Sequence, residues 1–245
     1  ANQFKELQVD PDRAQETIAI SPDLKWLVLV RLNQPAQLWN VSERTVQLLP
    51  SVGGPLAFAV FSPDSQFLAL PLATNAVALW HLRTWRQVAS IPCWVPNEAS
   101  VSFATVADRL AIGGRTNVLL WDLQAQRRVG QFAMQGDRSI ALSPDAKLLA
   151  TGSRDQKVRL YDCQTGQEFS APLLGHLSGV ERVSFAPDGR SLVSASRQWV
   201  KLWNLATRRE VASYQQPARV LLTTFSTDGS TLLTSDGAGR FIQIW

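Results

Sequence analysis

The stretch SPDAKLLATGSRDQKVRLYD, residues 143–162, places a short apolar run between two turn signals and closes on an aromatic residue followed by an acid. Five other stretches of the 245-residue chain share this layout. Their closing aromatics follow one another at intervals of 40 to 42 residues, in the order Trp39, Trp80, Trp121, Tyr161, Trp203 and Trp245. Six copies at a near-constant period indicate one supersecondary unit repeated along the chain.

Each repeat predicts four short strands. In the fifth repeat, these strands correspond to residues 179–185, 191–196, 199–203 and 206–214. Short segments of this kind, joined by Pro-Asp or Asp-Gly turns, are typical of an antiparallel meander. No segment keeps a helical period over 11 residues. The sequence therefore predicts an all-β chain in which neighbouring sheets cover one another's apolar faces.

The Ser-Pro-Asp-Gly-like turns, the Trp121-Asp122 pair and the Gly175-His176 pair resemble the WD40-repeat (WD-repeat) β-propeller family. The resemblance covers essentially the whole chain and implies a single domain, residues 1–245, that forms a six-bladed propeller of four-stranded antiparallel blades, as in a bacterial-type array. It also implies that Gln3–Val9 adds the outer strand of the last blade and closes the ring. The alternatives are a frayed N-terminus and a fragment of a seven-bladed or longer array.

Blades of this family often contain a buried network of His, Ser or Thr, Asp and Trp. The fifth repeat matches it at His176, at Ser194 or Ser196, and at Trp203, but lacks the Asp. The fourth repeat has Asp155 but no His, and no repeat holds the full set. The resemblance therefore assigns structural roles to Trp39, Trp80, Trp121, Tyr161, Trp203, Trp245, Asp155 and His176, with apolar packing as the main support of the blades.

The chain lacks the patterns of the common enzyme classes. Its two histidines are 95 residues apart, and its two cysteines have no Cys-x-x-Cys spacing, so we expect no metal site and no cofactor. No Gly-x-Ser-x-Gly elbow, glycine-rich phosphate loop or His-Glu-x-x-His motif is present. The chain contains no run of about 18 apolar residues, which is the pattern that would predict a membrane span. We expect a non-enzymatic, cytoplasmic, monomeric protein with free thiols.

The best binding signal lies in the connections between the second and third strands of the repeats. In a propeller these connections surround one mouth of the central channel, and five of the six carry an arginine. Two tryptophans outside the repeated core position belong to the same face. The predicted partner-binding residues are Arg31, Arg115, Arg154, Arg197, Arg240, Trp94 and Trp199. The alternative is that the arginines are solvated turn residues and that Trp199 packs at the start of its strand.

These features predict a scaffold that binds a protein or an acidic peptide at the channel mouth, as the C-terminal module of a larger signalling protein. The alternative is nucleic-acid binding through the basic face. Against it, the net charge is only +4, only 5 of the 24 basic residues are lysines, and no stripe of aromatic residues is interleaved with them.

Overall fold

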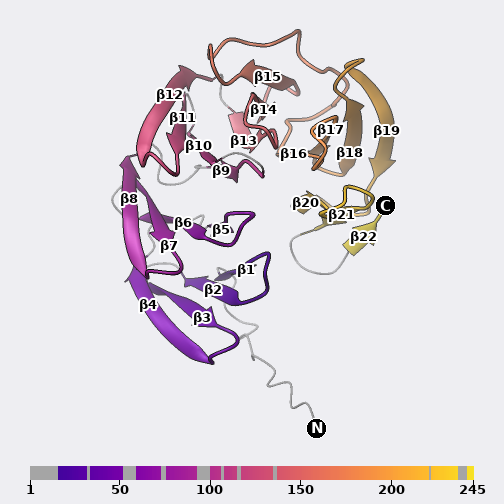
Figure 1. The fold of residues 1–245 in the computed structure, drawn as a ribbon. Helices are drawn as coiled ribbons and strands as arrows, with labels where there is room; N and C mark the ends of the chain where they lie inside the picture. Colours follow the sequence, from indigo (N-terminus) through magenta and orange to yellow (C-terminus); the bar gives the residue numbers. More distant parts are fainter. Residues whose placement is uncertain are drawn as a thin grey trace.

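The computed structural model describes residues 16–31, 34–51, 59–72, 76–92, 100–105, 108–114, 117–134, 137–220, 222–236 and 242–245. Within these ranges the chain forms strands and no helix. Figure 1 shows six antiparallel sheets following one another around a common axis, with the first strand of each sheet innermost. The predicted all-β, six-bladed propeller is therefore confirmed.

The first three blades each contain four strands in simple meander order. Blade 1 comprises β1 (Glu16–Ile20), β2 (Trp26–Arg31), β3 (Pro35–Asn40) and β4 (Thr45–Ser51). Blade 2 comprises β5 (Val60–Phe61), β6 (Phe67–Leu72), β7 (Ala76–His81) and β8 (Arg86–Pro92). Blade 3 comprises β9 (Ser100–Phe103), β10 (Arg109–Gly113), β11 (Asn117–Asp122) and β12 (Arg127–Ala133).

The other three blades follow the same order with shorter sheets in two cases. Blade 4 comprises β13 (Asp137–Leu142), β14 (Leu148–Ser153) and β15 (Val158–Asp162). Blade 5 comprises β16 (Arg182–Phe185), β17 (Ser191–Ser196), β18 (Trp199–Asn204) and β19 (Arg209–Gln215). Blade 6 comprises β20 (Leu222–Phe225), β21 (Leu232–Ser235) and β22 (Ile242–Ile244).

The outer edges of blades 4 and 6 differ from the rest. After β15 the chain pairs with that strand through two isolated bridges, Tyr161 to Glu168 and Val158 to Leu173, rather than a continuous ladder, so an irregular segment covers the edge. In blade 6 the described sheet ends at β22. The segment predicted to complete it, Gln3–Val9, lies outside the described residues, so its closing role stays a prediction.

The turn between the first and second strands explains why the Ser-Pro-Asp signal recurs. In blade 4 the Ser143 hydroxyl donates to Asp145 Oδ1 at 2.8 Å, and the same oxygen accepts the Lys147 amide at 3.1 Å. The Leu148 amide then donates to Ser143 Oγ at 2.9 Å. The same serine-to-aspartate bond forms in blades 1, 2 and 6. Each aspartate is thus occupied in shaping its own turn.

The core lies between adjacent blades rather than inside any one of them. Leu38, Leu68 and Leu70 are at most 1% exposed and belong to one cluster shared by blades 1 and 2. Leu160 and Leu192 lie in a second cluster shared by blades 4 and 5. A single blade has no means of burying these side chains by itself, which is why the repeats fold as a stacked series.

Serine hydroxyls also join the innermost strands. Each innermost strand pairs on one side only, so half of its backbone N–H groups lack a strand partner. Ser100 Oγ accepts the amide of Ile140 at 3.2 Å, and Ser139 Oγ accepts the amide of Val183 at 3.2 Å. These bonds satisfy channel-side amides and hold blades 3, 4 and 5 in register around the channel.

Candidate functional site

Three of the seven predicted partner-binding side chains are described, all of them in blades 4 and 5. Arg154 lies in the β14–β15 turn, and Arg197 and Trp199 lie at the β17–β18 turn. Arg31 ends β2, but its side chain is not among the described ones. Arg115, Arg240 and Trp94 lie outside the described residues. The candidate site therefore comprises the part of the channel mouth that blades 4 to 6 form.

Arg197 occupies a tight turn that directs it outward. Ser196 pairs with Trp199, which leaves only Arg197 and Gln198 to connect β17 with β18. The backbone of Arg197 has a φ of 47°, in the left-handed region that two-residue hairpins require. Its side chain is exposed, and Trp199 beside it is 37% exposed.

Backbone hydrogen bonds join these turns to the segments that enter the next blades. The Val180 amide donates to Ser153 O at 2.9 Å, and the Val220 amide donates to Arg197 O at 2.6 Å. The entering segment before β16 carries Leu177, which is 85% exposed. These contacts place the turns and entering segments on one continuous face. We call it the mouth surface and define it by Arg154, Leu177, Glu181, Arg197, Trp199 and Arg219.

The charge of Arg219 on this surface is largely compensated. Its guanidinium donates to the two carboxylate oxygens of Glu181 at 2.7 and 2.8 Å, and Glu181 is only 8% exposed. These hydrogen bonds raise the pKa of Arg219 above its ordinary value. Arg182 donates to the Glu181 backbone oxygen at 2.8 Å, and burial lowers its pKa. Arg154 and Arg197 are the other exposed cations of the mouth surface.

Blade 5 brings His176 and Trp203 together around one serine hydroxyl. Trp203 Nε1–H donates to Ser194 Oγ at 2.8 Å, and His176 Nε2 lies 2.6 Å from the same oxygen. Ser196 Oγ lies 2.7 Å from His176 Nδ1. Burial, followed by the nearby Lys201 charge, lowers the pKa of His176 to about 4, so the ring is neutral at pH 7. Both serines that matched the family network therefore contribute, one at each ring nitrogen.

The other closing aromatics have fewer partners. Among the described residues, no acceptor reaches the buried indole nitrogens of Trp39, Trp80 and Trp121. Leu29, Leu70 and Ile112 stand in these blades where blade 5 has Ser194. Trp245 Nε1 donates to Thr234 Oγ1 at 3.3 Å, and Tyr161 stacks on Phe132 with 5.8 Å between ring centroids.

Asp155 forms an ion pair instead of joining a histidine network. It accepts Nη1 of Arg159 at 3.1 Å as well as Nη2, and the Arg159 side chain is only 7% exposed. The Arg159 hydrogen bond lowers the pKa of Asp155 to about 2. Asp155 therefore neutralises a buried cation within blade 4.

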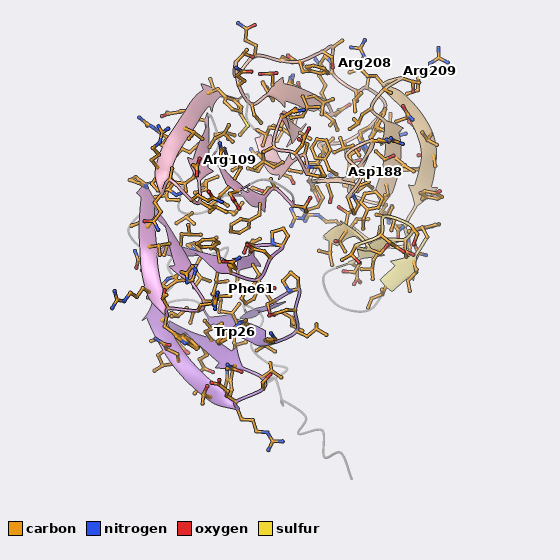
Figure 2. The ribbon with its side chains drawn as sticks, in the orientation of Figure 1. Trp26, Phe61, Arg109, Asp188, Arg208 and Arg209 are labelled. Carbon is orange, nitrogen blue, oxygen red and sulfur yellow. The ribbon has the colours of Figure 1, made fainter. Side chains whose placement is uncertain are left out.

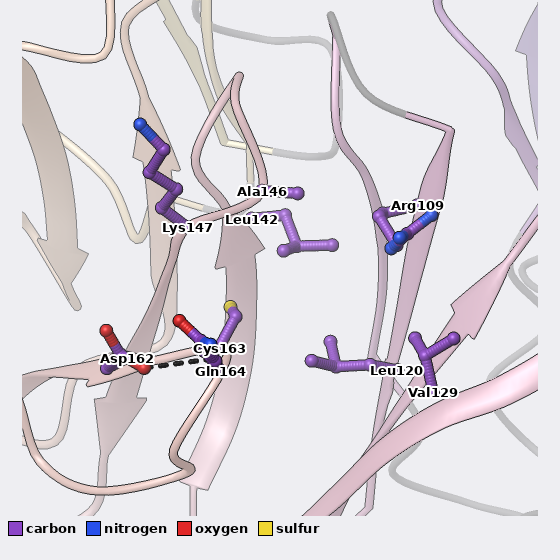
Figure 3. Close-up of a pocket in the computed structure, with 9 residues that line it drawn as sticks. All are labelled: Arg109, Leu120, Val129, Leu142, Ala146, Lys147, Asp162, Cys163 and Gln164. Carbon is purple, nitrogen blue, oxygen red and sulfur yellow. Dashed lines mark hydrogen bonds between the residues drawn. The ribbon is translucent and has the colours of Figure 1, made fainter.

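Two cavities lie away from the predicted site. One, of about 390 Å³, lies between blades 3 and 4, and Figure 3 shows the residues that the two blades contribute to its lining. Arg109 and Leu120 come from blade 3, whereas Lys147, Asp162 and Cys163 come from blade 4. Burial raises the pKa of the Cys163 thiol to about 12, so it is not a nucleophile at neutral pH.

The other cavity, of about 530 Å³, opens on the central channel at the opposite face from the mouth surface. We call it the bowl and define it by Phe103, Phe185, Phe225, Pro63, Pro144 and Pro187. These residues recur at fixed positions, just before and within the first turn of their repeats. That recurrence is the sequence signal for the bowl, although each phenylalanine by itself has the pattern of a core residue.

In the described part of the chain, no group of three His, Cys, Asp or Glu side chains could hold a metal ion. The same residues include no helix long and apolar enough to cross a membrane.

Comparison with known proteins supports a WD40-repeat assignment. The family described as "WD domain, G-beta repeat" matches residues 135–162 and 167–204, which end at the third strands of blades 4 and 5. The chain is 30% identical over 218 residues to transcription initiation factor TFIID subunit 5 of Caenorhabditis elegans, covering 84% of this chain and 32% of that protein. It is 28% identical over 157 residues to Protein FIZZY-RELATED 3 of Arabidopsis thaliana, covering 61% of this chain and 33% of that protein.

A further match is the serine-threonine kinase receptor-associated protein of Mus musculus, 27% identical over 100 residues, which cover 41% of this chain and 29% of that protein. The aligned part of the chain thus spans about a third of the length of these relatives.

Proposed function

We propose that this WD40-repeat chain is a non-enzymatic scaffold that binds a protein or an acidic peptide on its mouth surface. The names of two relatives describe a subunit of a transcription initiation factor and a protein associated with a kinase receptor. Both names refer to assemblies of proteins, which supports an interaction role for the shared repeats.

The observation that carries the proposal is the exposed set of apolar and cationic side chains on one rigid face. Leu177 is 85% exposed and Trp199 is 37% exposed. Trp199 follows the exposed Arg197 by two residues, and Leu177 lies two residues before Gly179, which packs against the backbone of the exposed Arg154. A tryptophan buried by a partner is worth about 2 kcal/mol or more, whereas an exposed ion pair contributes about 0.2–1 kcal/mol. The tryptophan would therefore supply most of the affinity, and the arginines would select an acidic partner.

The described residues also favour a role without catalysis. The Cys163 thiol is protonated at neutral pH, and the His176 ring is buried between two serines in a blade interior. Neither group forms a nucleophile–base pair at a cavity, which is the arrangement that covalent catalysis requires.

The proposal includes the wider setting expected from the sequence. The chain would act as a monomer in the cytoplasm, as the C-terminal module of a larger signalling protein. Its arginine-rich, lysine-poor composition is the basis for expecting a bacterial source. Sedimentation of the purified chain tests the monomer, and the reading frame beyond residue 245 tests the position within a larger protein.

The experiment is an affinity capture with Arg154→Glu/Arg197→Glu beside Arg208→Glu/Arg209→Glu. In the control pair, Arg208 ends the β18–β19 turn and Arg209 begins β19, at the outer part of blade 5, and the change in charge is the same (Figure 2). A partner captured by the wild type and the control, but lost with the first variant, supports the proposal. Equal capture by all three contradicts it. DNA or RNA affinity that falls steeply with salt and depends on Arg154 and Arg197 would favour nucleic-acid binding instead.

A further inference from the structure

The bowl has the size and shape of a binding site. Its volume of about 530 Å³ lies within the roughly 300–1,000 Å³ common for ligand pockets. Its wall is formed by the ends of β9, β13, β16 and β20, the innermost strands that surround the axis in Figure 1. Four blades thus contribute to one concavity, and a fifth adds Pro63 from its first turn.

The interior of the bowl is apolar, with hydroxyl groups between the rings. Phe103 and Phe185 are each 8% exposed, and Phe225 completes the aromatic lining. The lining also contains six hydroxyl side chains: Ser102, Thr105, Ser184, Thr224, Ser226 and Thr227. No charged side chain belongs to the lining among the described residues. Such a surface accepts a large apolar side chain and disfavours a buried charge.

Carboxylates stand one residue beyond the lining on several sides. Asp64, Asp145 and Asp188 directly follow the three lining prolines, and Asp228 follows the lining Thr227. All four are exposed (Asp188 is labelled in Figure 2). The Ser226 hydroxyl and the Ser230 amide lower the pKa of Asp228 to about 2, so it is ionised at neutral pH.

Basic residues offset this rim only in part. Lys147 Nζ lies 3.5 Å from Asp145 Oδ2, and its side chain is 80% exposed. Arg190 follows Asp188 by two residues, as Lys147 follows Asp145. At the corresponding positions after Asp64 and Asp228 stand the uncharged Gln66 and Ser230. The rim is therefore negative on balance, and most clearly so in blades 2 and 6.

We propose that the bowl is a second binding site, which takes a short basic segment of a partner protein. One large apolar side chain of that segment enters between the phenylalanines and prolines, and flanking Lys or Arg side chains meet the rim carboxylates. This goes beyond the proposed function, because it lies on the opposite face and selects a partner of opposite charge. The two proposals therefore fail independently.

The test uses the whole 245-residue chain and three fluorescein-labelled peptides. The peptide Lys-Arg-Phe-Arg-Lys carries both the anchor and the charges, Lys-Arg-Gly-Arg-Lys lacks the anchor, and Glu-Glu-Phe-Glu-Glu reverses the charges. Fluorescence anisotropy measures each dissociation constant. We expect the first peptide to bind the most tightly, by about tenfold or more over the anchorless one, because burying a phenylalanine contributes about 1.5–3 kcal/mol.

The key variant is Asp64→Asn/Asp228→Asn. Asparagine keeps the oxygen that accepts the Ser62 or Ser226 hydroxyl and the turn amide, so the turns are preserved while both charges are removed. Each lost charge should weaken Lys-Arg-Phe-Arg-Lys by about two- to fivefold. Glu43→Gln, an exposed carboxylate in the β3–β4 turn, is the control and should leave binding unchanged.

A second variant, Thr227→Trp, fills the opening from an exposed lining position and should abolish the preference for the phenylalanine peptide. Circular dichroism and thermal melting verify that each variant is folded. The proposal is overturned if no peptide binds at about 1 mM, or if the three peptides bind equally. It is overturned likewise if Asp64→Asn/Asp228→Asn binds Lys-Arg-Phe-Arg-Lys as tightly as the wild type does, or if the chain shows concentration-dependent self-association that Thr227→Trp blocks. The last would assign the bowl to a second copy of the chain.

Discussion

Replacing Ser194 by alanine removes one hydroxyl that serves two buried groups. Ser194 is 0% exposed, and its Oγ lies 2.8 Å from Trp203 Nε1 and 2.6 Å from His176 Nε2. Without it, the indole N–H and one imidazole nitrogen lose their partners in the interior of blade 5. Each unsatisfied buried polar group costs about 1–3 kcal/mol. We therefore expect Ser194→Ala to lower the free energy of unfolding by about 2–4 kcal/mol, a large part of the roughly 5–15 kcal/mol typical of a domain.

Blade 4 supplies the matched control at the same position. Thr151 is also 0% exposed, but its Oγ1 has no hydrogen-bond partner among the described residues. In blade 4, Tyr161 occupies the position that Trp203 has in blade 5, so no indole N–H donates to the Thr151 hydroxyl. Thr151→Val keeps the shape and removes a buried hydroxyl that makes no bond. Its effect should lie between no change and about 1 kcal/mol of stabilisation.

The assay is equilibrium unfolding in urea, followed by far-ultraviolet circular dichroism and by tryptophan fluorescence. Coincident transitions with an unchanged m-value license the comparison of free energies. The reasoning is refuted if Ser194→Ala lies within about 0.5 kcal/mol of the wild type. It is refuted equally if Thr151→Val is destabilised as much as Ser194→Ala, because burial alone would then account for both.

Three further changes test other contacts. The pKa of His176 is about 4 in the fold and about 6.5 when unfolded. Its contribution to the free energy of unfolding is therefore complete above pH 6.5 and is lost, by at most about 3 kcal/mol, as the pH falls toward 4. Over this range the urea midpoint should fall less for His176→Gln than for the wild type. Ile112→Thr offers an acceptor to the buried Trp121 indole, so it should be at least as stable in urea as Ile112→Val, and a lower stability would show that no bond forms. If Gln3–Val9 completes blade 6, deleting residues 1–9 should lower the melting temperature by roughly 2–4 °C for each kcal/mol of stability lost, whereas a frayed terminus predicts no shift.

The repeat pattern was sufficient to predict the fold because each decisive signal is local. The Ser143 turn is closed by bonds within five residues, and the closing aromatics mark where each third strand ends. Once the period was known, stacking of the sheets followed from their apolar faces. The irregular edge of blade 4 was not predicted, although Pro172, which has no backbone N–H to donate, lies within that segment.

Side-chain partners were harder to predict because they depend on which blades meet. The sequence position of Arg219, in a segment that enters a blade, indicates one more cation at the channel mouth, yet it binds Glu181, which lies 38 residues earlier in the chain. Asp155 fitted a histidine network, but the local partner is Arg159. The bowl was missed for a related reason, because its concavity exists only after several repeats have been placed around the axis.

The two proposed sites share one short strand, which bears on whether they communicate. Strand β16 has only four residues: it begins at Arg182, beside Glu181 at the mouth surface, and ends at Phe185 in the bowl. The faces are thus about 10 Å apart along this strand. Coupling between sites requires an element with two alternative arrangements. Strand β16 is instead held to β17 over its whole length and to β13 by the Ser139 bond, a single arrangement that binding at either end leaves in place. A partner at the mouth should therefore leave the affinity of the bowl unchanged, so the ring would hold two partners at once and bring them together.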